Sequence, residues 1–317
     1  MRYLLINRFK GALLGALLGE VLAKDAKAEY GISSDTSQIA VLGTKSLIEL
    51  GKLDIDNWLK SDQTKSLQDR TDGVLRKVMI ATLPVALFFH ENRTTLRQNL
   101  LCMLQIWGDD PVMRDCTLAV GYAIAQCLTE NISPRTLIPE IIAFIGETPT
   151  LLPQKLLELN DLLAKGVGLE TAQAAFNRPE EPTHAIAMAF YCFLSTLEDL
   201  HLAVLRATHK HNTRREETDN LDSQIISLIT GALSGAYNST AGIPLKWQLL
   251  LCSANLDTGE RRNFSKVLEL ADALVAVWSG VYDPALHLKD YSEEGCAKCA
   301  EQDTLPVFAS PRVIQSR

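Results

Sequence analysis

Two polar segments, each directly before an apolar helical run, carry the residue types best suited to chemistry in this chain. The first segment precedes the run 39–50 and holds Ser34, Asp35, Thr36 and Ser37. The second precedes the run 225–237 and holds Asp222, Ser223 and Gln224. Each segment alone is typical of a helix N-cap, in which Ser or Asp accepts hydrogen bonds from the first backbone amides. If folding brings the two helix starts together, their carboxylate and hydroxyl oxygens form a set suited to a hard cation or a hydroxylated ligand.

Helical periodicity dominates the elements that must position these residues, and the sequence has no convincing period-two strand or Asn-Gly hairpin. The pattern predicts an all-α fold, with helices at about 7–24, 37–52, 76–90, 94–107, 112–129, 135–145, 153–165, 183–209, 223–237, 244–253 and 264–279. Short connections favour a single compact domain over 1–288, followed by a partly ordered C-terminal extension over 289–317.

Two further features of the pattern concern packing around the helix starts. Glycine and alanine recur on the apolar faces of 11–19 and 231–235, so these helices can approach their neighbours closely. The polar segment 209–220 mixes charges of both signs, and we expect it to form an exposed, mobile loop beside the second helix start.

The composition is that of an ordinary globular protein, with 47% apolar and 22% charged types among 317 residues, which excludes a disordered or fibrous chain. Acidic residues outnumber basic ones by 38 to 31, so we expect neither nucleic acid nor an anionic membrane as a partner. The seven cysteines are an odd number and most lie in apolar helical runs, which favours reduced thiols and a cytoplasmic location. The pair Cys296 and Cys299 has no nearby further ligands for zinc, and we interpret it as incidental surface thiols.

Several blocks, in a specific order over residues 7–280, together resemble the ADP-ribosylglycohydrolase family. They include RFKGALLGALLGEVLA (8–23), SDTSQIAVLGTKSLIELGKLD (34–54), AIAMAFYCFL (185–194) and DSQIISLITGALSGAYNSTAGIPLKW (222–247). The resemblance implies an all-α fold, two bound magnesium ions and hydrolysis of the glycosidic bond between ADP-ribose and a modified side chain or small molecule. The expected partner is then an ADP-ribose-like small molecule or an ADP-ribosylated protein.

The chain departs from both metal-binding motifs of that family. At the first, which reads T-D-D-T, Asp35 is retained but Thr36 replaces the second carboxylate. At the second, which reads G-G-D-x-D-T, Asp222 is retained, Gln224 replaces the second carboxylate and Ile225 replaces the closing hydroxyl. The two glycines of the second motif are also missing.

The resemblance assigns roles to the retained and substituted positions. Asp35 and Asp222 would be metal ligands, so we expect them to approach within about 8 Å, close enough to share one hydrated magnesium ion. Glu20 and Glu29 are the candidates for the acid–base group. Contacts to the cofactor or the ribose would come from the remaining polar residues of the two segments, which are Ser34, Thr36, Ser37, Ser223 and Gln224.

The ligand count limits the metal that these residues can hold. Divalent hard cations are bound by oxygen clusters in which carboxylates supply the neutralising charge, so we expect at most one weak magnesium site. The function predicted is that of an ADP-ribosylglycohydrolase-like protein with reduced or lost hydrolytic activity. The alternative is a non-catalytic family member that senses a ligand or binds another protein.

Overall fold

Fourteen α-helices and no strand make up the part of the chain that the structure describes, which confirms the all-α prediction. The structure, a computed structural model, describes residues 3–23, 34–59, 73–130, 132–176, 182–209, 218–253 and 262–281. The predicted C-terminal extension, the pair Cys296 and Cys299, and Glu29 lie outside these residues. Most of the predicted loop 209–220 lies outside them too, but its last three residues are helical rather than loop.

The described helices have the following bounds. In chain order they are α1 (Leu5–Ala23), α2 (Ser34–Leu50), α3 (Ile55–Leu59), α5 (Val74–Phe88), α6 (Arg93–Leu104), α7 (Pro111–Thr129), α8 (Leu137–Ile145), α9 (Leu152–Ala164), α10 (Leu169–Ala175), α11 (Pro182–Leu194), α12 (Leu200–Thr208), α13 (Thr218–Asn238), α14 (Leu245–Ser253) and α15 (Arg262–Ser279), with a 3-10 turn η2 (Thr240–Gly242) after α13.

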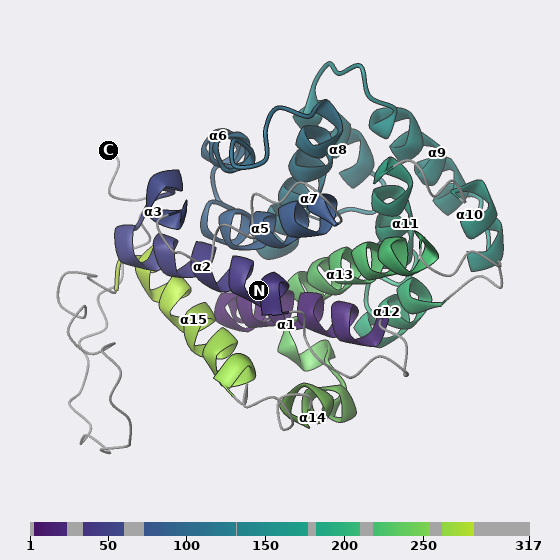
Figure 1. The fold of residues 1–317 in the computed structure, drawn as a ribbon. Helices are drawn as coiled ribbons and strands as arrows, with labels where there is room; N and C mark the ends of the chain where they lie inside the picture. Colours follow the sequence, from purple (N-terminus) through teal and green to yellow (C-terminus); the bar gives the residue numbers. More distant parts are fainter. Residues whose placement is uncertain are drawn as a thin grey trace.

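Helices α1 and α13 form the centre of the fold and lie side by side through the middle of the molecule (Figure 1). They share the most extensive helix–helix contact of the described chain, and α13 also packs on α11, α12 and α7, while α1 packs on α15. Almost every residue of α1 from Arg8 onward is buried. An apolar helix surrounded on all sides in this way is a core helix, and its sequence shows little one-sided amphipathicity for that reason.

Glycines set the distance between α1 and α13. A Cβ atom built on Gly15 would lie 2.1 Å from the carbonyl oxygen of Gly231, and one built on Gly231 would lie 2.0 Å from the oxygen of Gly15. Gly11 meets Gly235 in the same reciprocal way, and a Cβ on Gly19 would lie 2.0 Å from the backbone oxygen of Ser227. The two backbones are therefore in direct contact over three successive turns, as the glycine spacing in the sequence indicated.

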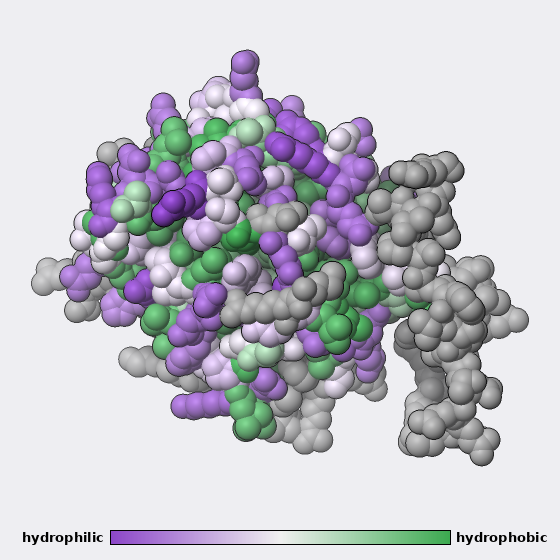
Figure 2. Space-filling view, turned by 180° about the vertical axis from the view of Figure 1, so that it is seen from behind, coloured by the Kyte–Doolittle hydropathy of each residue, from purple (hydrophilic) through white to green (hydrophobic). Residues whose placement is uncertain are grey.

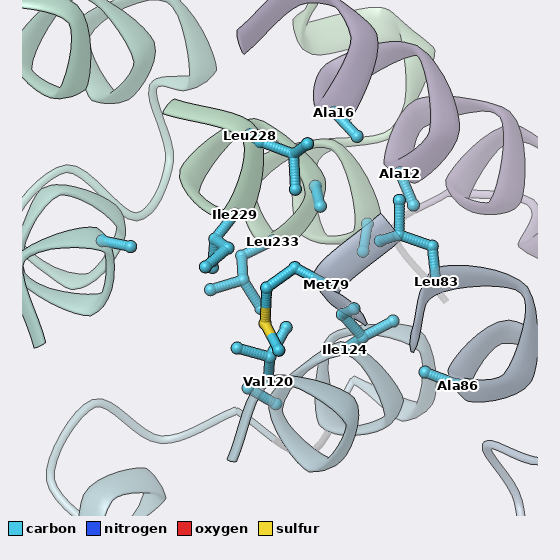
Figure 3. Packing of buried hydrophobic residues seen from close by; sticks show 14 of the residues in the cluster. Ala12, Ala16, Met79, Leu83, Ala86, Val120, Ile124, Leu228, Ile229 and Leu233 are labelled. Atoms are coloured by element: carbon cyan, nitrogen blue, oxygen red, sulfur yellow. The ribbon is translucent and has the colours of Figure 1, made fainter. Parts of the chain in front are cut away.

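Helices α5 and α7 close the core on one side of this pair. Figure 3 shows Met79 and Leu83 of α5 and Val120 of α7 converging with Leu228 and Leu233 of α13. Pro84 lies inside α5 without ending the helix. The buried cluster runs through all these helices without a break, so the described residues form one hydrophobic core.

The predicted and observed helices differ where tertiary contacts decide the boundaries. The predicted helix 183–209 is two helices, because Asp199 caps α12 by accepting a hydrogen bond from the backbone amide of Leu202 at 2.9 Å. The five-residue helix α3 was not predicted; its Trp58 ring is buried against Gly43 of α2. Helix α10 was not predicted either. Helices α2 and α13 begin at Ser34 and Thr218, several residues before the predicted starts.

Polar and apolar residues alternate on the surface. On the face shown in Figure 2, hydrophilic residues surround smaller hydrophobic patches. Within the described residues, no helix combines the length and the apolar character that crossing a membrane requires. Four cysteines of the described chain, Cys102, Cys116, Cys127 and Cys192, are free. Burial raises the pKa of the Cys192 thiol to about 12, so this thiol stays protonated and unreactive at neutral pH.

A buried histidine couples the fold to pH. The ring of His90 packs against Phe9 of α1 and Trp278 of α15, with centroid distances of 5.6 and 5.0 Å. Its Nδ1 atom lies 2.8 Å from the carbonyl oxygen of Leu87 and must therefore donate a proton to it. Burial lowers the pKa of His90 to about 4, although the hydrogen bond to Leu87 acts in the opposite direction.

We expect the free energy of unfolding to fall by about 3 kcal/mol between pH 7.5 and pH 4 because of His90 alone. Histidine in the unfolded chain has a pKa near 6.5 and takes up a proton before His90 in the folded protein does. The contribution of His90 to the free energy of unfolding is therefore complete above pH 6.5 and is lost as the pH falls towards 4. Urea unfolding at a series of pH values measures this loss, and the His90→Phe variant should lose less stability over the same interval. An identical pH dependence in the two proteins would contradict the assignment to His90.

Candidate functional site

Three helices bring predicted site residues together at one end of the central pair. The antiparallel contact of α1 with α13 pairs Gly11 with Gly235, Gly15 with Gly231 and Gly19 with Ser227. Continued by one turn, this register places the C-terminal end of α1 beside the first turns of α13. Glu20 of α1 and Gln224 of α13 are thereby neighbours, although 204 positions separate them in the sequence.

Glu20 is a buried carboxylate, with a relative exposure of 1%. One of its oxygens, Oε1, lies 3.5 Å from Nη1 of Arg76, which is the third residue of α5. The same Nη1 atom donates a hydrogen bond to Oε1 of Gln224 at 2.8 Å. A single guanidinium thus links α1, α5 and α13, and we call the group of Glu20, Arg76 and Gln224 the α1–α5–α13 site.

Arg76 was not among the residues predicted from the sequence. It lies in the first turn of a helix that is otherwise strongly apolar, directly after Gly73, whose φ of 78° is the left-handed conformation that favours glycine. The positive end of the helix dipole disfavours a cation in the first turn, so an arginine there requires acidic or oxygen-bearing partners from other elements. The position of this arginine could have indicated a site residue, but the sequence does not show which residues are its partners.

Two hydroxyl groups of α13 are unpaired within the described part of the chain. Ser223 and Ser227 are buried, one turn apart on the same helix, and neither hydroxyl has a hydrogen-bond partner in the described part of the chain. The same holds for Nε of Arg76. Buried polar groups without partners are uncommon in folded proteins and are a reason to look for a ligand or ordered water nearby.

Glu20 also borders a cavity of about 30 Å³ between five helices. Apart from Glu20 its wall is apolar, formed by Leu13, Ala16, Leu17, Ala40, Ile80, Leu83, Leu228 and Val267. Ligand pockets for small molecules measure roughly 300–1,000 Å³, so this cavity has room for water but not for a nucleotide. Its effect is to keep one side of the Glu20 carboxylate in an apolar environment.

For the other predicted residues, the structure describes the position in a helix but not the side chain. Ser34, Asp35, Thr36 and Ser37 form the first turn of α2, and Asp222 lies in the second turn of α13. The side chains of these five residues lie outside the described part, so the expected approach of Asp35 to Asp222 stays a prediction. Ile225 is buried, in agreement with its apolar type, and offers no oxygen at that position.

The described side chains do not fit a divalent cation. Among the described residues, no group of three or more His, Cys, Asp or Glu side chains lies close enough together to hold a metal ion. Glu20 and Gln224 are the two predicted residues that the structure brings together around one point, and both turn an oxygen towards a guanidinium. A cation bound between them would meet the fixed positive charge of Arg76.

Comparison with known proteins identifies relatives of the chain. The sequence profile of the family described as ADP-ribosylglycohydrolase matches residues 1–284. A solved structure described as "ADP-ribosylglycohydrolase-related protein complex" is similar in fold, with a TM-score of 0.60 at 15% identity, covering 86% of this chain and 98% of that one. No curated protein matches the sequence significantly.

Proposed function

Because the chain belongs to the ADP-ribosylglycohydrolase family, we propose that its α1–α5–α13 site recognises an ADP-ribosyl group and has a reduced or lost ability to hydrolyse it. The family acts on ADP-ribosylated substrates and is commonly metal-dependent. The ligand class is therefore inherited from the family, whereas the loss of hydrolysis is argued from the residues of this chain.

The hydrogen bond from Arg76 to Gln224 carries this proposal. Gln224 occupies the position of a carboxylate in the family's second motif, and an amide oxygen supplies no negative charge. Its oxygen is moreover engaged by a guanidinium at 2.8 Å. An oxygen in that state is a poor ligand for a divalent ion, which requires lone pairs that do not already face a cation.

Glu20 supports the same conclusion. A carboxylate that acts as a general acid or base must exchange a proton with the substrate or with water. Glu20 is buried, borders an apolar cavity and is ion-paired with Arg76. A role in holding Arg76 fits these contacts better than a role in proton transfer. Asp35 and Asp222 remain the proposed carboxylates on the ligand side of the site, and Glu29 remains the proposed acid–base group.

The test compares binding with turnover in the full-length protein. We expect isothermal titration calorimetry to detect ADP-ribose binding, and we expect little or no magnesium-dependent release of ADP-ribose from peptides modified on arginine or serine. Asp222→Ala should weaken the binding, whereas Glu158→Ala is a matched control, because Glu158 lies on α9 and pairs with its helical neighbour Lys155.

Two outcomes would contradict the proposal. Magnesium-dependent turnover that disappears in both Asp35→Ala and Asp222→Ala would show an active hydrolase. Absence of ADP-ribose binding in the wild-type protein would favour the alternative, a family member that binds another protein through the same fold.

A further inference from the structure

We propose that Arg76 is the resident cation of the α1–α5–α13 site: its guanidinium takes the place of a divalent metal ion at Glu20 and Gln224 and excludes such an ion. We therefore expect ADP-ribose binding to need no metal at these two oxygens. The inference rests on the proposed function for the identity of the ligand alone; the exclusion of metal is argued from the geometry.

The position of the guanidinium is the first argument. Its Nη1 atom lies between two oxygens from different helices, 2.8 Å from Gln224 and 3.5 Å from Glu20. An ion at either oxygen would need lone pairs that already face the guanidinium and would lie close to its positive charge. Arginine and metal therefore compete for the same oxygens, and only one can be bound.

Charge is the second argument. Arginine keeps its positive charge at every physiological pH, so the competing cation is permanent rather than dependent on conditions. Gln224 is neutral, and the only negative charge that the described residues bring to Nη1 is that of Glu20. Among the described residues, the one carboxylate at this point already faces a guanidinium, which lowers its affinity for a divalent ion.

The way in which Arg76 is held is the third argument. Its side chain is only 16% exposed and its Nε is buried, so most of the side chain is enclosed by the surrounding helices. The first turn of α5 follows Gly73 in a left-handed conformation and packs its next residues into the core. The guanidinium is thus fixed by the fold, as a bound ion would be.

The experiment titrates the full-length protein with Mn²⁺ alone, followed by electron paramagnetic resonance of the free ion. We expect the wild type to bind no Mn²⁺ with a dissociation constant below about 1 mM, and Arg76→Met to bind it at least about tenfold more tightly. Arg76→Lys keeps the charge and should behave as the wild type does. Adding Glu20→Gln to Arg76→Met should abolish the gain, which places the ion at Glu20.

Several results would overturn the inference. A folded Arg76→Met variant without any gain in Mn²⁺ affinity would show that Arg76 does not exclude the ion. If circular dichroism shows that Arg76→Met does not fold, Arg76→Gln takes its place. The wild type gives an independent test. A dissociation constant for Mn²⁺ below about 1 mM in the wild type, together with about tenfold weaker binding in Glu20→Gln, would contradict the proposal.

ADP-ribose binding in the presence and absence of EDTA separates this inference from the proposed function. We expect EDTA to leave the affinity of the wild type unchanged. Binding that is lost with EDTA and restored by Mg²⁺ would overturn the resident cation but not ADP-ribose recognition. Absence of ADP-ribose binding under every condition would overturn the proposed function, while the Mn²⁺ comparison would still test Arg76.

Discussion

Replacing Gly15 or Gly231 by valine is expected to lower the free energy of unfolding by about 4 kcal/mol or more, or to prevent folding altogether. A Cβ atom at Gly15 would lie 2.1 Å from a backbone oxygen of Gly231, and one at Gly231 would lie 2.0 Å from that of Gly15. Backbone atoms cannot change rotamer to make room, so α1 and α13 would have to separate. Their contact is the most extensive helix–helix contact of the described chain. Even alanine should destabilise the protein, despite its higher helix propensity.

Urea unfolding followed by circular dichroism measures the effect. The matched control is Gly168→Ala, because a Cβ atom there meets nothing within 4 Å and the backbone φ of −74° suits any residue. We expect this control to change the stability by less than about 1 kcal/mol. Wild-type stability in Gly15→Val would show that the two helices are further apart than described. A partly stable variant would also be informative, since separation of the helices should weaken ADP-ribose binding by moving Glu20 away from Gln224.

Removing the carboxylate of Asp115 is expected to cost about 3–5 kcal/mol in Asp115→Ala. Asp115 on α7 is fully buried, with 0% exposure, and its Oδ2 accepts hydrogen bonds from the hydroxyls of Thr148 and Thr150, each at 2.5 Å. Its Oδ1 accepts from Nε of Arg114 at 3.1 Å. Without the carboxylate, the hydroxyls of Thr148 and Thr150 and the Nε of Arg114 lose their acceptor. The connection between α8 and α9 then keeps only the hydrogen bond from Arg114 to Thr148 as a polar contact with α7 among the described residues.

Asp115→Asn is the control, because it keeps one acceptor oxygen and nearly the same volume. We expect it to cost less than Asp115→Ala, and Thr150→Val to cost about 1–2 kcal/mol by removing a single donor. Thermal unfolding of the four proteins gives the comparison. Equal stability of the Asp115→Ala variant and the wild type would show that the network contributes nothing.

The sequence predicted the helices well where their own pattern determines them. The stretches that became α1, α5, α7 and α9 begin and end within about two residues of their predicted limits, since periodicity and punctuation by proline and polar residues act locally. The boundary between α11 and α12 was missed because the apolar pattern continues through it. There the side chain of Asp199 caps the new helix, and a short polar signal of this kind is weak beside a strong periodicity.

The sequence likewise predicted part of the candidate site, and folding decided the rest. Glu20 and Gln224 were predicted, and the spacing of the glycines at 11, 15 and 19 and at 231 and 235 indicated close helix packing. That spacing does not state which helix each one meets. Only the folded chain pairs Gly15 with Gly231, and this register is what brings the end of α1 to the start of α13.

By itself, the sequence determined the all-α class and the family, because both follow from residue types and their order. Only the tertiary structure decided which side chains contact Glu20 and Gln224. Arg76 lies 56 positions from Glu20 and 148 from Gln224, and nothing in its local pattern names either partner. Its contacts arise because the glycine faces let α1 and α13 meet and because α5 packs across them. The sign of the charge at the centre of the site is therefore a property of helix packing, which couples residues far apart in the chain.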